Sequence, residues 1–580
     1  MKISSPGVTF SLGPWRVEPD RNAISQGDEE RHLEHRLMQT LVFLAENQGE
    51  TVSREQFFDS VWHGIVVNEE ALSRAISLLR TALGDNAHRP TYIQTIPGLG
   101  YRLIADVVIR GEQRMAEPHP REFHENSIAV LPFVNLSEDP ANEYFSDGIT
   151  EEILNVLAQG KIFKVVGRTS SFVFKGKNKD LRKIGKALDV AHVLEGSVRK
   201  ADSRVRITAQ LIKTEDGFHL WSETFDRELE DVFAIQDEIA SAVLEALKVT
   251  LLGITMEPQI ARGTNNTDAF KAYLKGLHER NRGSVKDTLN TARHSFEQAV
   301  ALDPGYAKAW AALAFTFSDL IWNSFIEFEN GRSRMHEAAS KAIKLAPEMA
   351  DGHLAMGKYW QLGMPKWQPT LAALGTALRL NPGNTEVLVE WARTNLNLGH
   401  WDNAVNAARK ALTMEPISVY VNHLLGHILY FSRHYEEAIV ALRRTLDLNP
   451  NFPKPRYFIA MAHHWMGNSE TAWEVIQEEP LEWMRLCASA VILHKLGRTV
   501  EANDALARLI EMGLEETNYI QQADIYAQMG DHFQAIECLN KAMDMGDPGL
   551  AQLLVDPFLD PIRDDPQFKE IFTKAGFEQA

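Results

Sequence analysis

The chain has 580 residues, 24% of them charged, and a formal net charge of −18. This length suggests about three to five structural units, and the acidic balance predicts that most of the surface repels nucleic acid. Only Cys487 and Cys538 are present, which excludes a disulfide framework and a cysteine-based zinc site and fits a reducing cytoplasm. No secretory signal and no run of about 18 apolar residues occurs, so we expect a cytoplasmic protein without a membrane segment.

The stretch 53–103 starts with a helix that carries its own capping signal. Ser53 is followed three residues later by Gln56, the spacing of a capping box. This helix should pack against the rest of its domain through Phe57, Val61 and Trp62. We therefore expect it to support a neighbouring element.

A second amphipathic helix is predicted over Glu69–Leu83, with Asn68 as its N-cap and Gly84 at its end. At 3.6 residues per turn, one apolar stripe must be buried, made of Leu72, Ile76, Leu79 and Leu83. The opposite side is polar and consists of Glu70, Ser73, Arg74, Ser77, Arg80 and Thr81. Such a face can enter a major groove, where Arg, Ser and Thr bind bases or phosphates.

A strand-turn-strand signal follows this helix. Residues 92–95 and 101–104 are of strand type and flank the sequence IPGLG, whose glycines permit a tight bend. The order helix, helix, hairpin predicts a winged helix-turn-helix, with the hairpin as the wing.

The phrases SREQ, VNEEALSRAISLLRTALGD and YIQTIPGLGYRL resemble the OmpR/PhoB-type effector domain, and its CadC-like and HilA-like members most, over residues 8–106. The resemblance implies that the helix Glu69–Leu83 reads the major groove of double-stranded DNA. By position, it places contacts to bases, phosphates or backbone on Arg54, Ser73, Arg74, Ser77, Arg80, Thr81 and, in the wing, Arg102.

Two features depart from that family's pattern. The wing tip carries Gly98 and Leu99 where relatives usually have Lys or Arg, and Leu78 stands on the outer face of the second helix. We expect Leu78 to pack against the wing or a second subunit, with a contact to a thymine methyl as the alternative. Residues 1–110 hold eleven Lys and Arg against fourteen Asp and Glu, a net charge of −3. Since DNA affinity rests largely on neutralised phosphates, this domain should depend on clustered arginines or on dimerisation.

A small α/β domain is predicted after a polar, proline-containing linker. Strands are expected at 127–133, 164–167, 192–200 and 204–213, and helices at 144–158, 180–188 and 231–247. The phrases IAVLPFVNLSEDPANEYFSDGITEEI and VLEGSVRK, with LWSETFDRELEDVFAIQDEIA, resemble a TolB-like or FlgO-like domain. This resemblance implies no catalytic residues.

Two features of the α/β domain could have indicated an enzyme. The acids Asp147, Glu151 and Glu152 cluster at the start of a predicted helix, where helix capping is favoured over acid-base chemistry. The stretch FKGKNK at 174–179 lacks the spacing of a Walker A loop and is interpreted as a solvated loop.

The last region is repetitive. Pro347, Pro382, Pro416 and Pro450 follow similar endings at spacings of 35, 34 and 34 residues, and small residues recur at Ala392, Ala404, Ala408, Ala411 and Gly426. This is the period of tetratricopeptide repeats, which the region resembles, and we expect seven or eight helical hairpins between Asp268 and Met545. The first helices of the hairpins should form a surface for a peptide or partner helix.

Aromatic and histidine residues of the repeats offer further candidate sites. The aromatic residues are expected mainly to pack between repeats, with a ligand groove as the alternative; they are Trp310, Trp360, Trp391, Tyr420, Tyr430 and Trp465. His423 and His427 have the spacing of a zinc-protease helix but lack its glutamate, so a metal site is not expected. His463 and His464 are adjacent and point about 100° apart on a helix.

The sequence thus predicts a multidomain chain: a winged helix (α+β) at 1–108, a linker at 109–126, a small α/β domain at 127–252, a linker at 253–267 and an all-α superhelix with a C-terminal cap at 268–580. The predicted function is a DNA-binding transcription regulator, preferably an activator that contacts RNA polymerase, controlled by a protein, peptide or metabolite at its C-terminal domains. A homodimer would present two recognition helices to two half-sites. No cofactor, metal or enzymatic activity is expected. The competing hypothesis is an interaction scaffold whose winged helix binds protein.

Overall fold

The structure is a computed structural model. It describes residues 9–13, 15–18, 23–26, 29–33, 35–49, 51–54, 56–57, 69–86, 90–96, 99–105, 107–110, 127–159, 164–177, 180–201, 204–228, 238–239, 241–242, 245, 263–283, 285–363, 365–512 and 518–577. The chain folds as two compact units, Met1–Glu122 and Phe123–Ala580.

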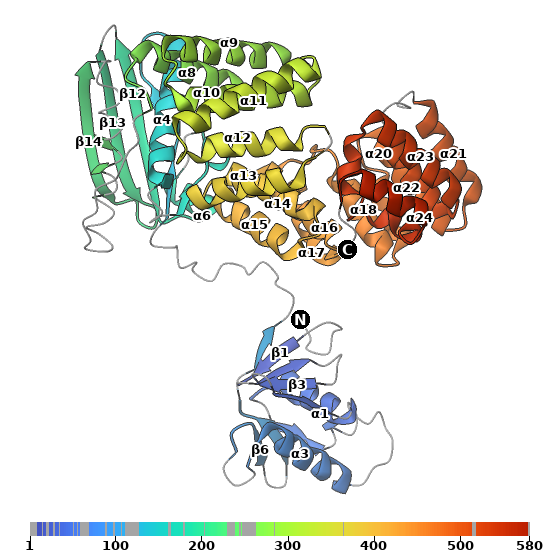
Figure 1. Cartoon of the computed structure of the whole chain (residues 1–580). Coiled ribbons are helices and arrows are strands. Elements are labelled where there is room, and N and C mark those ends of the chain that lie inside the picture. Colours follow the sequence, from blue (N-terminus) through green and yellow to red (C-terminus); the bar gives the residue numbers. More distant parts are fainter. Residues whose placement is uncertain are drawn as a thin grey trace. The chain divides into compact units, whose positions relative to one another are not determined.

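The smaller unit contains an antiparallel sheet in the order β4-β3-β2-β1-β8 (Figure 1). Its strands are β1 (Thr9–Leu12), β2 (Trp15–Glu18), β3 (Ala23–Gln26), β4 (Glu29–His32) and β8 (Val107–Arg110). Phe10 and Leu12 of β1 and Trp15 and Val17 of β2 are buried, so alternate side chains of these two strands point into one core.

The remaining elements of this unit pack on the same core. They are α1 (His35–Glu46), β5 (Thr51–Ser53), α3 (Glu69–Leu83), β6 (Ile93–Ile96) and β7 (Gly100–Leu103). The three strands form a second antiparallel sheet in the order β5-β7-β6. The predicted helix Glu69–Leu83 is confirmed, and the hairpin strands lie within one residue of their predicted bounds.

The larger unit begins with a mixed sheet in the order β11-β9-β12-β13-β14, with β10 paired to β12. Its strands are β9 (Ser127–Val130), β10 (Val134–Asn135), β11 (Lys164–Val166), β12 (His192–Ala201), β13 (Arg204–Lys213) and β14 (His219–Glu228). Its helices are α4 (Glu143–Gln159), α5 (Arg168–Phe172) and α6 (Leu181–Leu188), with a short 3-10 turn at Pro140–Asn142.

Strand β14 was not predicted from the sequence. Of its residues only Phe225 is buried, so the strand has no apolar alternation from which it could be recognised. It forms because it pairs with β13 along almost its whole length. Most of the helix predicted at 231–247 lies outside the described residues.

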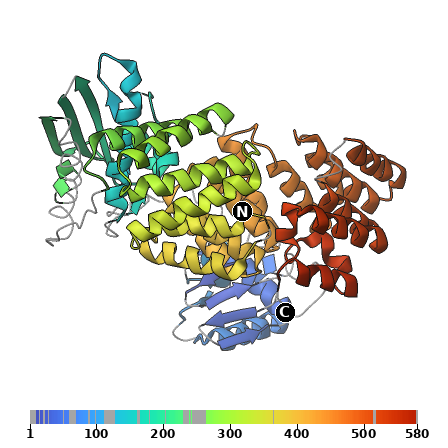
Figure 2. The same ribbon diagram turned by 45° about the horizontal axis from the view of Figure 1, so that its top comes forward.

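Eight helical hairpins follow within the described part of residues 267–545, consistent with the expected seven or eight. Their first and second helices alternate: α8 (Thr267–Asn281), α9 (Lys286–Leu302), α10 (Ala307–Trp322), α11 (Phe328–Leu345), α12 (Ala350–Gln361), α13 (Trp367–Leu380), α14 (Thr385–Asn397), α15 (Trp401–Met414), α16 (Val419–Phe431), α17 (Tyr435–Leu448), α18 (Pro455–Trp465), α19 (Ser469–Ile476), α20 (Glu482–Lys495), α21 (Thr499–Glu511), α22 (Tyr519–Met529) and α23 (His532–Met545). Figure 2 shows the successive hairpins stacked on one another.

Small residues set the spacing of these helices, as predicted. Ala392, Ala404, Ala408 and Ala411 are fully buried where α14 meets α15. A Cβ on Gly426 would lie 2.6 Å from the Leu442 side chain, so α16 and α17 approach more closely than a larger residue would allow. The chain ends in a cap of two 3-10 helices, η4 (Pro548–Gln552) and η5 (Pro557–Ile562), and α24 (Pro566–Lys574).

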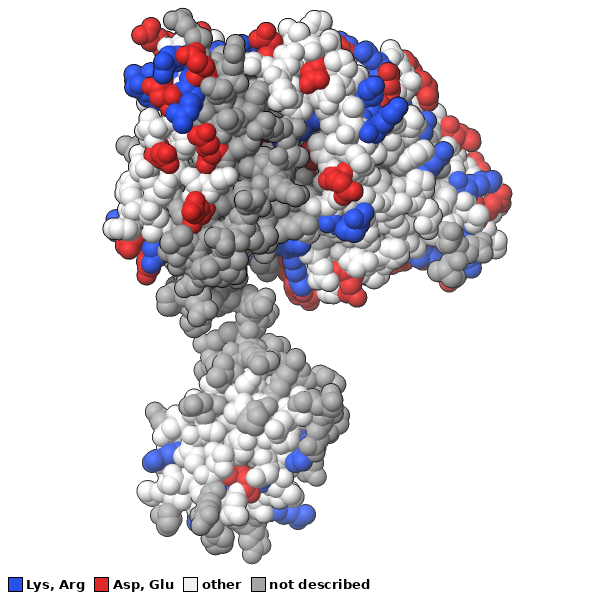
Figure 3. All heavy atoms as spheres, turned by 60° about the vertical axis from the view of Figure 1, so that its left-hand side comes forward, with Lys and Arg blue, Asp and Glu red and all other residues white. Residues whose placement is uncertain are grey.

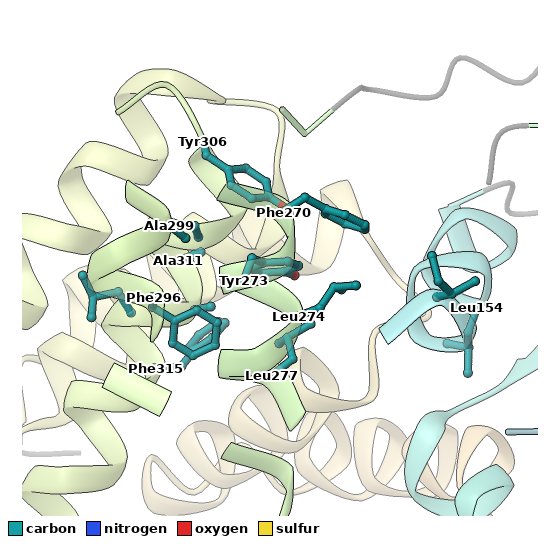
Figure 4. Packing of buried hydrophobic residues seen from close by; sticks show 14 of the residues in the cluster. Leu154, Phe270, Tyr273, Leu274, Leu277, Phe296, Ala299, Tyr306, Ala311 and Phe315 are labelled. Carbon is teal, nitrogen blue, oxygen red and sulfur yellow. The ribbon is translucent and has the colours of Figure 1, made fainter. Parts of the chain in front are cut away.

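The α/β part and the first repeats share one hydrophobic core. Leu154 of α4 and Phe270, Leu274 and Leu277 of α8 belong to the same buried cluster, and Figure 4 shows these side chains between the two helices. A Cβ on Gly148 would lie 2.5 Å from Leu274, so α4 and α8 pack closely. The α/β part therefore packs directly on the first repeat and shares its hydrophobic core.

Candidate nucleic-acid interface

Helix α3 is held by its apolar stripe and by its C-terminal end. Leu72, Ile76, Leu79 and Leu83 are all buried, as predicted. Gly84 has a φ of +70°, the left-handed conformation that ends a helix. The indole of Trp15 donates to the carbonyl of Leu83 at 3.1 Å, and Arg31 donates to that of Ala82 at 2.7 Å. The N-terminal sheet thus fixes one end of α3, while Asn68 lies outside the described residues.

The outer face of α3 is polar and exposed. Ser73, Arg74, Ser77 and Thr81 are all exposed, and Arg74 makes no hydrogen bond or ion pair with another described residue. The Thr81 hydroxyl donates to the carbonyl of Ser77 at 3.0 Å. These four predicted contact residues therefore lie on one face of a helix whose other face is buried.

The other predicted arginines are engaged within the unit. Arg80 Nη2 donates to the carbonyl of Ile93 at 2.8 Å and to Thr95 Oγ1 at 2.9 Å, which joins α3 to the wing strand β6. Arg102 of β7 donates to Thr51 Oγ1 of β5 at 2.6 Å through Nη2. Both guanidinium groups keep further N–H donors, so their roles at DNA stay predictions.

The first helix of the pair starts as the sequence indicates. The amide of Ser53 donates to Gln56 Oε1 at 2.8 Å, and the amide of Gln56 donates to Ser53 Oγ at 3.2 Å. The capping box is therefore confirmed. Arg54 is partly buried in this first turn, Phe57 is fully buried, and Val61 and Trp62 lie outside the described residues.

The wing is a regular hairpin with an apolar tip. Thr95 pairs with Tyr101 and Ile96 with Gly100, and the amide of Leu99 donates to the carbonyl of Ile96 at 3.1 Å. The side chain of Leu99 is 62% exposed, and Gly98 lies outside the described residues. Leu78 of α3 is also exposed, at 42%, and its packing against the wing or a second subunit stays a prediction.

Asp85 connects α3 to the wing and was not singled out from the sequence. Its carboxylate accepts from the amides of Thr91 at 2.7 Å and Ile93 at 2.8 Å. The sequence did hold a signal for this role, because Asp85 directly follows Gly84, which ends the helix, and precedes the first wing strand. The wing is therefore tied to the recognition helix by both Asp85 and Arg80.

The acids of α4 do not cap the helix, contrary to the expectation from the sequence. Because α4 begins at Glu143, Asp147, Glu151 and Glu152 lie within the helix. Their carboxylates pair with Lys175, Arg168 and Lys308 at 2.5, 3.0 and 2.6 Å.

The pKa values of two of these acids move in opposite directions. Burial alone would raise the pKa of Asp147, but hydrogen bonds from His278 and Lys175 lower it overall. Burial raises the pKa of Glu151. The loop residue Lys175, expected to be solvated, thus serves as a counter-ion.

The first helices of the repeats, expected to offer a ligand surface, already contact other parts of the chain. Helix α4 packs on α8, and at the other end η5 packs on α22. Phe558 of η5 lies against Tyr457 and Trp465 of α18, and Gln528 of α22 donates to its carbonyl at 2.6 Å. Arg433 holds Asp560 through two hydrogen bonds of 2.7 and 2.9 Å.

The aromatic and histidine candidates mostly pack within the repeats. Tyr430 is buried, whereas Tyr420 is exposed. The four tryptophans are partly buried; they are Trp310, Trp360, Trp391 and Trp465. His423 and His427 lie among Phe431, Phe452 and Phe458, and burial lowers the pKa of His423 to about 4. Among the described residues no group of three His, Cys, Asp or Glu side chains could hold a metal.

Charges of both signs are mixed on the described surface of the larger unit that Figure 3 shows. Figure 3 shows Lys and Arg interspersed with Asp and Glu over its visible face. Ion pairs such as Arg204 and Arg206 with Asp226 account for part of this pattern. The described helices include none long and apolar enough to cross a membrane.

Known families match both ends of the chain. Residues 28–103 match the family described as transcriptional regulatory protein, C terminal, and residues 419–452 and 517–545 match the tetratricopeptide repeat. The N-terminal unit is thus a winged helix of OmpR/PhoB type, and the C-terminal region is a tetratricopeptide superhelix. The TolB-like or FlgO-like resemblance of the middle part stays a prediction.

Three relatives illustrate the similarity of the chain to named proteins. The transcriptional regulator HilA of Salmonella typhimurium is 24% identical over 417 residues, which cover 71% of this chain and 65% of HilA. The transcriptional activator CadC of Escherichia coli is 38% identical over 107 residues, 18% of this chain and 21% of CadC. "Putative adenylate cyclase 3" of Rhizobium meliloti is 39% identical over 246 residues, 42% of this chain and 41% of that protein. The chain thus spans less than two thirds of each.

Proposed function

We propose that this protein binds double-stranded DNA through α3 and the wing and regulates transcription, as an activator. The observation that carries the proposal is the exposed face of α3, with Ser73, Arg74, Ser77 and Thr81 opposite a fully buried stripe. A helix of this kind, anchored by a sheet at one end and by a wing at its side, can enter a major groove without rearranging its own core. The named regulators among its relatives support the same function.

Arg74 is the side chain on which the proposal is best tested. Replacing Arg74 with Ala should weaken binding of a labelled duplex, recovered from a randomised pool by the intact protein, by about tenfold or more. The slope of log affinity against log salt should also become shallower, by about one if Arg74 contacts a phosphate. Fluorescence anisotropy across a salt series measures both quantities.

Arg182→Ala is the matched control. Arg182 is an exposed arginine of α6 in the larger unit, paired with Asp180 at 3.1 Å. Its loss should leave affinity unchanged. If the intact protein recovers no duplex at low salt, the DNA-binding proposal is wrong and the interaction scaffold becomes the better explanation. If Arg74→Ala binds the recovered duplex as the parent does, the assignment of DNA binding to the exposed face of α3 is wrong.

The larger unit is proposed to control this activity through protein or small-molecule contacts. We include in the proposal the predicted division into three domains, a homodimer that presents two α3 helices, contact with RNA polymerase and a cytoplasmic location. Because α4 and η5 already cover parts of the first helices of the repeats, an incoming partner must use the remaining surface or displace them. Exposed side chains of the repeats, among them Tyr420 and Phe533, are available for such contacts.

We further propose that the protein acts by binding and not by catalysis. The α4 acids that could have served as acid-base groups are each paired with a lysine or arginine. The similarity to a protein named as a cyclase makes nucleotide turnover the appropriate test. Measurable cyclase activity of the purified chain with ATP and a divalent cation would contradict this part of the proposal.

A further inference from the structure

One apolar side chain stands on the face of α3 that is proposed to meet DNA. Leu78 is 42% exposed, although it belongs to a helix whose other leucines, Leu72, Leu79 and Leu83, are at most 3% exposed. The helix therefore has a complete apolar stripe without Leu78. Core packing of this unit does not account for a leucine at this position.

The position of Leu78 relative to the polar contact residues follows from helix geometry. Leu78 is four residues after Arg74 and one after Ser77, so on a helix it lies about 40° around the axis from Arg74. Side chains spaced by four residues are neighbours on a helix surface. Arg74 and Thr81 flank Leu78 by four and three residues, and both are exposed.

A helix in the major groove meets one apolar group on the base edges, the C5 methyl of thymine. We propose that Leu78 is a specificity-determining residue that recognises this methyl, so that the bound sequence carries a thymine beside the base or phosphate contacted by Arg74. The proposal rests on DNA binding by α3.

Removal of a single methyl group tests the proposal directly. In a duplex recovered by the intact protein from a randomised pool, each thymine is replaced in turn by deoxyuridine, which pairs identically and lacks only the methyl. At one or two positions the parent protein should bind the deoxyuridine duplex about fourfold more weakly, the effect of exposing one buried methyl group. In Leu78→Ala this discrimination should disappear at that thymine and persist elsewhere.

Leu302→Ala is the matched control, because Leu302 is a leucine of helix α9 that is also 42% exposed and lies outside α3 and the wing. This variant should keep the full thymine preference. Leu78→Ala should remain folded, since the side chain is outside the core and alanine favours helix.

Three results would overturn the inference. The parent protein could bind DNA with no thymine sensitive to its methyl, which would leave the proposed function intact. Leu78→Ala could weaken binding of thymine and deoxyuridine duplexes equally, which would assign Leu78 to a contact between two copies of the chain. Absence of any DNA binding would overturn the inference together with the proposed function.

Discussion

Arg80 and Arg102, both predicted to contact DNA, also hold together the surface that is proposed to bind DNA. The guanidinium of Arg80 bridges α3 and β6, and that of Arg102 bridges β7 and β5. The bonds of Arg80 hold the wing strand β6 against α3, and the bond of Arg102 ties β7 to β5. Arg74 is exposed and has no such partner among the described residues. The two kinds of arginine cannot be told apart from their spacing alone.

Gly100 must be glycine because of a close backbone contact in the folded unit. A Cβ at this position would lie 2.0 Å from the carbonyl oxygen of Val52, across the pairing of β5 with β7. Gly100→Ala should therefore lower the free energy of unfolding of the smaller unit by about 1–3 kcal/mol, the usual range for overpacking. Hydrogen exchange of the β6 and β7 amides, followed by mass spectrometry, measures the change locally.

Gly383→Ala provides the comparison for this substitution. A Cβ on Gly383 would have no neighbour closer than 3.9 Å, and Gly383 lies in a turn of the repeats. The exchange of its neighbouring amides should hardly change. Equal effects of the two substitutions would mean that the close approach to Val52 is not what restricts residue 100 to glycine.

At the scale of elements, the N-terminus of the short helix α5 is capped by the side chain of a residue distant in sequence. Its N-cap, Gly167, has no side chain to offer. Instead the carboxylate of Glu415, at the end of α15, accepts from the amides of Thr169 at 3.1 Å and Ser170 at 2.6 Å. Burial raises the pKa of Glu415 even though these bonds favour its charged form. The α/β part is thus joined to the fourth hairpin as well as to the first.

Glu415→Ala should open this junction. The buried amide of Ser170 and the partly buried amide of Thr169 would lose their acceptor. Loss of the buried bond alone costs about 1–3 kcal/mol, so amide exchange in residues 167–172 should accelerate by about tenfold. Glu437→Ala is the control, because Glu437 of α17 forms an exposed ion pair with Arg409 of α15. Unchanged exchange in α5 of the Glu415 variant would show that the carboxylate does not hold the junction.

At the scale of the whole larger unit, buried acids make stability depend on pH. Asp556, at the start of η5, is buried and has a pKa raised by burial to about 6. Asp524 of α22 is also buried, and burial together with the charge of Asp556 raises its pKa. The cap therefore packs onto the last repeats most favourably while these carboxyl groups keep a proton.

Asp556→Asn tests this dependence. Between pH about 4 and about 6 the folded chain retains a proton that the unfolded chain has lost, so the contribution of Asp556 to stability falls as pH rises through this window. The variant has no proton to lose. Its unfolding free energy relative to the parent should therefore rise by up to about 3 kcal/mol from pH 4 to pH 7. Urea unfolding at both pH values measures this difference, and a constant difference would contradict the assignment.

The sequence by itself determined the elements whose signals are local. The apolar stripe and the Gly84 stop were enough to place α3 at Glu69–Leu83, and the 34-residue period with its small residues was enough to predict the stacked hairpins. The capping box of Ser53 and Gln56 is equally local. The stripe and the capping box span only a few turns of chain, and each repeat packs mainly on its sequence neighbours, so these patterns act over short distances along the chain.

Only the tertiary structure decided what distant residues do to one another. Strand β14 exists because β13 pairs with it, the α4 acids are counter-ions of residues including Lys308 in the repeats, and α5 takes its cap from Glu415. Hydrogen bonds and ion pairs between residues far apart in sequence leave no periodic signal, because in the sequence each charged partner looks like an ordinary surface residue. The partners are recognisable only once folding has brought them together.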